Sequence, residues 1–282
     1  MTTIKSLRIL NFVLFLLHFS SFVAILLLSK SKDVNSNIII YDNQIQPSVR
    51  NNSSRFSVFE KGEVSILNLI SAFFLITSLF HLFYALDINK IYSNSILNGT
   101  NPFRWLEYSL TATIMILIIA LSATVQIFDT LLSLLVITVA IMLLGNCIEI
   151  MIKQKEFFIA KMLTFIAWIL QVFVFVIIGK QFVSTIKSVN EELKKETDPT
   201  QIPDFVYAIL GTQLIFFSSF GFIQLFQLFK AERGKPQNYL TVERNYHILS
   251  LISKLTLGWI FYYGVTQQGN RTLAPQSTSS TS

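Results

Sequence analysis

The stretch Tyr246-His-Ile-Leu-Ser-Leu-Ile-Ser-Lys-Leu-Thr-Leu-Gly-Trp-Ile-Phe-Tyr-Tyr-Gly-Val265 is strongly apolar, yet it carries a lysine, Lys254, near its middle. In a helix, each end of the stretch lies about 12 Å or more from that lysine along the axis. A lysine stem does not readily reach water over this distance, and an ionisable group held at membrane depth marks a functional site by default. A buried lysine is also well suited to forming a Schiff base with an aldehyde.

The composition of the whole chain predicts a membrane protein. Hydrophobic residues make up 52% of the 282 residues, and charged residues make up 13%. A membrane-spanning helix needs roughly 20 mostly apolar residues. We therefore predict an all-α membrane protein, a single domain over residues 1–266, with seven transmembrane helices. The predicted spans are 8–29, 64–88, 103–127, 131–152, 157–182, 205–230 and 246–265. The first is too long for a signal peptide and lacks a cleavage site.

The distribution of charge favours a cytoplasmic N-terminus. Basic residues divide almost evenly between the two sides, but those on the N-terminal side lie in short connections, where the positive-inside rule applies. Acidic residues gather on the opposite side. In this orientation, three of the four glycosylation sequons face outward, at Asn51, Asn52 and Asn270, and Asn98 faces inward.

This orientation places residues 30–63 and 267–282 outside the cell. The first segment contains the apolar run 38–41 and the alternating run 55–59, which predict a hairpin that covers the outer surface. The second segment is rich in serine and threonine and is expected to be a disordered tail.

Several functional classes are disfavoured by what the chain contains. The net charge of +6 is assigned to the cytoplasmic face, where it attracts membrane lipid, so no nucleic-acid partner is expected. Cys147 is the only cysteine, which rules out an intrachain disulfide. The sequence has no phosphate-binding glycine loop, no metal-ligand spacing and no Ser/His/Asp arrangement, so we expect neither an enzyme nor a metal site. No internal repeat supports a transporter built from duplicated halves.

A partner for Lys254 is predicted in the third span. This span opens with Asn-Pro-Phe-Arg-Trp-Leu-Glu-Tyr-Ser-Leu-Thr over residues 101–111, which begins with a favourable N-cap followed by proline. Arg104, Glu107 and Thr111 share one helical face. Glu107 lies about 7 Å inside the helix start, at a depth comparable to that of Lys254. A plain Lys–Glu packing pair is the alternative, although such buried pairs are often no better for stability than apolar residues.

Taken together, these features resemble the microbial rhodopsins, and among them the heliorhodopsins. The resemblance covers nearly the whole chain and rests on the run 104–109, the Ser250-x-x-x-Lys254 spacing and the long first loop. It implies that Lys254 binds all-trans retinal as a protonated Schiff base with Glu107 as counterion, and that the N-terminus is cytoplasmic. It also implies a homodimer formed through the first loop and a signalling partner of unknown identity.

The resemblance further implies two sets of residues around the chromophore. The first set lines the retinal pocket: Tyr108, Thr111, Gly145, Trp168, Phe220 and Ser250. The second lines a polar cavity beside the Schiff base: His18, His81 and Arg104. The two histidines would accept the Schiff-base proton or bind water, although a histidine in a span is also a common interhelical hydrogen-bonding contact. His247 is expected near the membrane interface.

The chain departs from the pattern of a pumping rhodopsin. Ser250 replaces the second carboxylate that a proton pump usually carries one turn before the lysine, and Ile118 replaces the internal donor. Sodium and chloride pumps need other residues at the positions of Glu107, Thr111 and Ile118. We therefore predict a photoreceptor rather than an ion pump.

Two other functional classes remain open. A passive light-gated proton or cation channel would use ionisable residues along a path, namely Asp87, Glu149, Lys161, Glu191 and Glu192. A retinal-free receptor or transporter is the third class, but the chain lacks the paired cysteines and the Asp-Arg-Tyr and Asn-Pro-x-x-Tyr motifs of the large receptor family.

Overall fold

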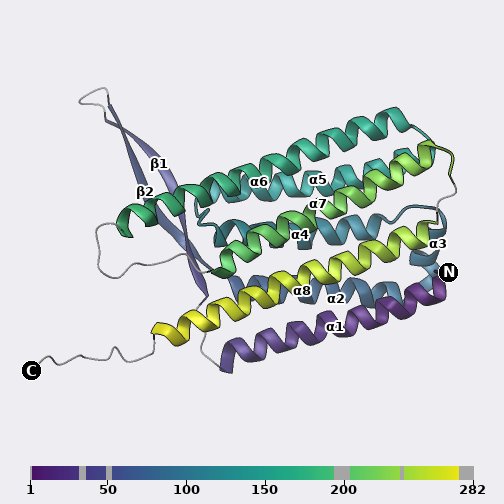
Figure 1. The fold of residues 1–282 in the computed structure, drawn as a ribbon, viewed down its shortest axis with the longest axis horizontal. Coiled ribbons are helices and arrows are strands. Elements are labelled where there is room, and N and C mark those ends of the chain that lie inside the picture. The colour runs from purple at the N-terminus through teal and green to yellow at the C-terminus, as the bar shows by residue number, and fades with distance from the viewer. Residues whose placement is uncertain (1, 32–35, 49–52, 194–203, 236–237, 273–282) are drawn as a thin grey trace, which may run out of the picture.

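The structure is a computed structural model that describes the chain except for residues 1, 32–35, 49–52, 194–203, 236–237 and 273–282. In this described part, seven helices are long and apolar enough to cross a membrane, which confirms the predicted fold class. They lie side by side in one bundle (Figure 1). These helices are α1 (Ile4–Ser31), α2 (Ile66–Leu86), α4 (Pro102–Ser122), α5 (Phe128–Gln154), α6 (Phe157–Leu193), α7 (Asp204–Glu232) and α8 (Tyr239–Thr272).

The predicted hairpin is present and is longer than a simple cap. Strands β1 (Asn37–Ser48) and β2 (Ser53–Ser65) pair antiparallel and project beyond one end of the bundle (Figure 1). At its base, Tyr41 bridges to Ile127 at the start of α5. Lys61 binds Asp42 at 2.8 Å and also lies 3.4 Å from the centre of the Phe128 ring. The Tyr41 bridge and the contact of Lys61 with Phe128 fix the hairpin to the bundle.

Local chemistry sets where several helices begin and end. Ser65 caps α2 by accepting a hydrogen bond from the backbone N–H of Asn68, and Asn101 caps α4 by accepting one from Arg104. Each cap satisfies one of the backbone donors that a helix start leaves free. At the other ends, Asp87 terminates α2 and Lys155 terminates α5 in the left-handed conformation.

Helices α6 and α8 exceed their predicted spans by the largest margins. Helix α6 continues to Leu193, well past the predicted end at 182, and α8 continues to Thr272, past the start of the predicted tail at 267. The rest of that predicted tail, residues 273–282, lies outside the described residues. A short 3-10 turn, η1 (Ile88–Lys90), and helix α3 (Ile91–Leu97) connect α2 to α4 at the end of the bundle where the chain begins (Figure 1).

The interior of the bundle is chemically asymmetric. The half nearest the hairpin is filled by a large apolar cluster that includes Phe74, Ile119, Ile178, Leu257 and Phe261. Because lipid tails are as apolar as these side chains, helices in a membrane associate through close packing and hydrogen bonds rather than through hydrophobic burial. Gly258 illustrates this packing, since a Cβ there would lie 2.7 Å from the Phe74 ring. The opposite half of the interior contains smaller apolar clusters together with buried charged side chains, and it holds the candidate site.

Candidate functional site

The centre of the candidate site is a buried ion pair between α8 and α4. Lys254 is 2% exposed, and its Nζ donates hydrogen bonds of 2.7 Å to Glu107 Oε1 and 2.7 Å to Thr77 Oγ1. Glu107 is 1% exposed and Thr77, on α2, is fully buried. Three helices therefore surround the lysine nitrogen with one carboxylate and one hydroxyl, which stabilises a positive charge away from water.

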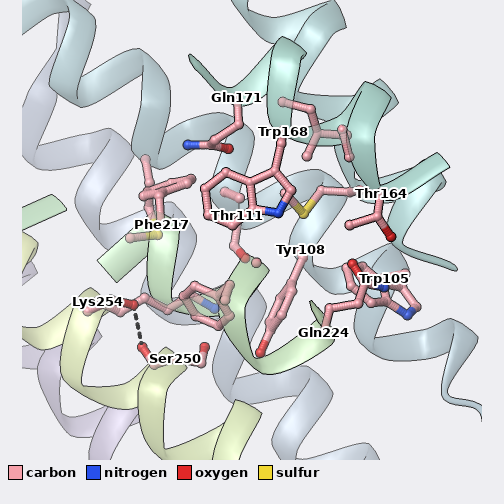
Figure 2. A pocket seen from close by; sticks show the side chains of 18 residues that line it. Trp105, Tyr108, Thr111, Thr164, Trp168, Gln171, Phe217, Gln224, Ser250 and Lys254 are labelled. Carbon is pink, nitrogen blue, oxygen red and sulfur yellow. Dashed lines mark hydrogen bonds between the residues drawn. The ribbon is translucent and has the colours of Figure 1, made fainter. Parts of the chain in front are cut away.

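A cavity lies next to this ion pair. Figure 2 shows Lys254 and Ser250 entering from α8, and Trp168 and Gln171 lying opposite them on α6. Of the residues predicted for a pocket, five line this cavity together with the lysine: Tyr108, Thr111, Trp168, Phe220 and Ser250. The wall is mainly aromatic and aliphatic, and the lysine amine is its one charged group among the described residues.

The sixth residue predicted for the pocket, Gly145, lies behind the wall rather than in it. A Cβ at Gly145 would lie 2.2 Å from Cζ3 of Trp105, so only glycine lets the indole lie this close to α5. Gly221 has the same relation to Trp168, where a Cβ would lie 2.8 Å from the indole Cζ2. Both glycines thus set the position of a tryptophan that lines the cavity.

Sequence reasoning missed several residues of the cavity wall. They are Trp105, Ala112, Met115, Ile141, Met142, Thr164, Ala167, Gln171, Phe217, Gly221, Gln224 and Ser253. Phe217, Gly221 and Gln224 follow helical spacing on α7, together with the predicted Phe220. That spacing carries little signal in the sequence because α7 is apolar on nearly every side. Trp105 is the residue among these that the sequence could have indicated, because it lies in the run 104–109 that also contains Glu107.

The predicted histidines form a buried group beside the ion pair. His18 and His81 are fully buried, and their rings stack with centroids 5.5 Å apart. His81 Nδ1 is 2.7 Å from Asn11 Oδ1, whereas neither ring nitrogen of His18 has a hydrogen-bond partner among the described residues. His247 packs edge-on against His81 at 5.1 Å and is 1% exposed. The prediction that His247 is interfacial is therefore wrong.

Arg104 belongs to a different cluster, nearer the end of the bundle where the chain begins. Its guanidinium pairs with Glu149 of α5 and Glu243 of α8, and all three side chains are fully buried. The indole N–H of Trp105 also donates to Glu149, at 2.9 Å, and Tyr239 donates to it at 2.8 Å. Arg104 is therefore not part of the wall of the cavity beside Lys254. Its neighbour Trp105 lines that cavity instead.

A buried tyrosine connects the histidines to this charged cluster. Asn11 Nδ2 donates to the Tyr92 hydroxyl at 3.3 Å, and that hydroxyl lies 3.2 Å from His247 Nε2 and 3.5 Å from Glu243 Oε1. Burial raises the pKa of Tyr92, which keeps the phenol protonated as a donor. The polar groups therefore form one connected network from His81 to Arg104.

Removing the arginine from this cluster is expected to destabilise the protein strongly. Arg104→Met leaves Glu149 and Glu243 buried without their cation, which should cost about 3–5 kcal/mol of unfolding free energy. Circular dichroism during reversible unfolding in mixed micelles measures this cost. The matched control is Arg233→Met, because Arg233 is exposed.

A compensating variant tests the reason for that loss. Combining Arg104→Met with Glu149→Gln and Glu243→Gln removes the stranded charges and should recover most of the stability. An Arg104→Met cost no larger than that of Arg233→Met would contradict the assignment of the cluster.

The ionisable residues proposed for a channel do not line up along one path in the structure. Glu149 is held by Arg104, and Lys161 pairs with Glu232. Asp87 accepts hydrogen bonds from the backbone N–H and hydroxyl of Ser93. Glu191 is exposed near the far end of α6, and the side chain of Glu192 lies outside the described residues.

Nearly the whole chain matches a known protein family. The Heliorhodopsin family model matches residues 7–266, which include every residue that lines the cavity. The chain belongs to the heliorhodopsin family. This heliorhodopsin is accordingly an integral multi-pass membrane protein, and its family implies a retinal chromophore. No curated protein matches the chain by sequence.

Solved structures with the same fold are microbial rhodopsins. The light-driven proton pump of Coccomyxa subellipsoidea has a TM-score of 0.56 at 12% identity, covering 91% of this chain and 96% of its own. A thermophilic rhodopsin has a TM-score of 0.56 at 12% identity, with coverage of 95% and 94%. The transmembrane domain of the Salpingoeca rosetta rhodopsin phosphodiesterase has a TM-score of 0.60 at 10% identity, with coverage of 94% and 85%. At such identities the likeness establishes the fold alone.

Proposed function

We propose that this heliorhodopsin is a light-absorbing photoreceptor in which Lys254 carries all-trans retinal as a protonated Schiff base and Glu107 is the counterion. The observation that carries the proposal is the 2.7 Å contact between Lys254 and Glu107 beside an aromatic cavity. When bound, retinal supplies visible absorption and a light-driven change of shape. The proposed topology has a cytoplasmic N-terminus and an extracellular hairpin.

The chemistry of the cavity fits such a chromophore. Its aromatic and aliphatic wall suits a long apolar polyene, and the lysine provides the amine that condenses with an aldehyde, releasing water. Gly145 and Gly221 allow Trp105 and Trp168 to occupy their places along the wall. Glu107 and Thr77 would hold the charged nitrogen in one orientation.

The histidine group is proposed as the acceptor of the proton that the Lys254 nitrogen releases in the light. His18 stacks on His81 in the buried interior, and both nitrogens of its ring lack a partner in the described structure. A neutral imidazole has one ring nitrogen without a hydrogen, and this nitrogen can accept a proton. The network through Asn11 and Tyr92 would then stabilise the changed charge on the histidines.

The asymmetric interior supports a role other than transport. The polar network leads from the histidines to one end of the bundle, whereas the apolar cluster fills the half near the hairpin. Ile118, at the position where pumps carry a donor, is fully buried in that apolar cluster. Ser250 offers no charge beside Lys254. A proton would therefore lack a relay through the second half of the protein.

Illumination is accordingly expected to produce no pumping current. Under voltage clamp with symmetric solutions, a pump would pass light-dependent current in one direction at zero voltage, and a photoreceptor would pass no sustained current at any voltage. Stationary current at zero voltage and symmetric pH would contradict the photoreceptor proposal.

The same recording tests the channel alternative. A passive pore would pass current that reverses near the proton or cation equilibrium potential. A reversing current that Glu149→Gln or Glu191→Gln reduces would favour the channel over the photoreceptor.

The partners are proposed from the same family relationship. We assign the hairpin as the contact of a homodimer, supported by the exposed apolar side chains of Val58 and Phe59 on β2. A photoreceptor also requires a signalling partner.

A further inference from the structure

A groove on the outside of the bundle, remote from the retinal cavity, combines apolar walls with two cations. It lies between the first turns of α1 and the last turn of α2, with a volume of about 620 Å³. The residues that line it are Ile4, Lys5, Arg8, Ile9, Phe12, Ala85 and Leu86. Lys5, Arg8, Ile9 and Phe12 follow the spacing of one helical face, so a single stripe of α1 forms most of the groove.

The basic end of the groove is held in place by specific contacts. Arg8 donates from Nε to the carbonyl of Ala85 at 3.0 Å and from Nη2 to that of Leu86 at 3.3 Å. Two of its five N–H donors are used in this way, which leaves the others for an outside acceptor. Thr3 and Ser6 cap the start of α1 reciprocally, so the turn that carries Lys5 is ordered.

Charged and apolar side chains follow one another along the groove in the same order as the headgroup and acyl chain of a phospholipid. Lys5 and Arg8 lie at the end of the bundle where a membrane surface meets the helix, and Phe12 lies about 10 Å deeper than Lys5. Ile9, Phe12 and Leu86 are each about half exposed, so their apolar surfaces face the acyl-chain region. The start of α1 adds the positive end of a helix dipole.

We infer that this groove binds one anionic phospholipid, with its phosphate on Lys5 and Arg8 and an acyl chain along Ile9, Phe12 and Leu86. The two cations attract the negative headgroup, and the apolar wall retains the chain. The inference holds for whichever leaflet meets the N-terminal end of α1. Asp87, which follows Leu86 at the end of α2, directs its carboxylate to Ser93.

Photo-crosslinking in nanodiscs tests this inference directly. The full-length protein is placed in nanodiscs that contain a trace of phosphatidylglycerol with a diazirine on its acyl chain, or phosphatidylcholine with the same diazirine. Mass spectrometry then maps the adducts. Phosphatidylglycerol should label residues 4–12 and 85–86 on the order of tenfold more than phosphatidylcholine does, since each nearby cation contributes to binding.

Charge-removing variants make the test specific for the groove. Lys5→Gln should reduce the labelling by about fivefold while leaving the contacts of Arg8 with α2 in place. The matched control is Lys153→Gln, which removes an exposed cation from the same end of the bundle on α5. Circular dichroism checks that both variants are folded.

Three outcomes would overturn the inference. One is equal labelling by the two lipids, which would indicate a general apolar contact. Another is unchanged labelling in Lys5→Gln. The third is an equal loss in Lys153→Gln, which would indicate a diffuse surface charge rather than a site.

Discussion

Replacing Lys254 with alanine is expected to abolish the visible absorption band of protein expressed with all-trans retinal. The reason is that Lys254 provides the only amine at the cavity among the described residues, and without it no Schiff base forms. Absorption spectra of the purified protein measure the effect, and circular dichroism verifies that the helices remain. Lys161→Ala is the matched control, because Lys161 also lies on a membrane helix but pairs with Glu232 near its end.

A rescue experiment separates loss of attachment from loss of the pocket. A preformed Schiff base of retinal with a small alkylamine should enter the cavity of Lys254→Ala and restore a visible band. A coloured Lys254→Ala protein without any added amine would refute the attachment site. Loss of colour in Lys161→Ala as well would point to a general folding defect.

Replacing Glu107 with glutamine is expected to shift the chromophore to ultraviolet absorption at neutral pH. The carboxylate lies 2.7 Å from the lysine nitrogen in a site closed to water, and removing it leaves a buried positive charge uncompensated. Each tenfold change in the protonation equilibrium corresponds to about 1.4 kcal/mol. Loss of such a partner should therefore move the pH at which the visible band disappears downward by several units.

The pH titration of the visible band checks this expectation. Glu149→Gln is the control, because that carboxylate is equally buried but binds Arg104 rather than Lys254. Its titration should stay close to that of the unaltered protein, provided that the variant folds. A visible band in Glu107→Gln with an unchanged titration midpoint, in buffer free of halide, would show that another group is the counterion.

Much of the architecture was predictable because the membrane restricts what a chain can do. In lipid every backbone polar group must be satisfied internally, so each long apolar run becomes a helix. Because charged residues are rare at membrane depth, Lys254 could be recognised as a functional residue. The start of α4 could be predicted from Asn101 and the proline that follows it. The ends of helices were harder to predict where polar residues continue the helix beyond the apolar run, as in α6 and α8.

Most of the side chains that line the cavity could not be predicted from the hydrophobic pattern of the helices. In water an amphipathic pattern shows which face of a helix is buried, but lipid is as apolar as a protein core and removes that signal. The sequence therefore could not reveal that Phe217 and Gly221 line the cavity, or that Gly145 acts by making room for Trp105.

The sequence by itself determined the seven helices, the buried lysine and its carboxylate at matching depth, because these follow from composition and from distance along single helices. The tertiary structure decided which polar groups became partners. Arg104 shares a helical face with Glu107, yet it binds Glu149 and Glu243, which come from two other helices. His247 was assigned to the interface and is instead buried against His81. A buried charge pairs with the opposite charge that helix packing brings close to it. The spacing of residues within one helix does not show which other helices will pack against it.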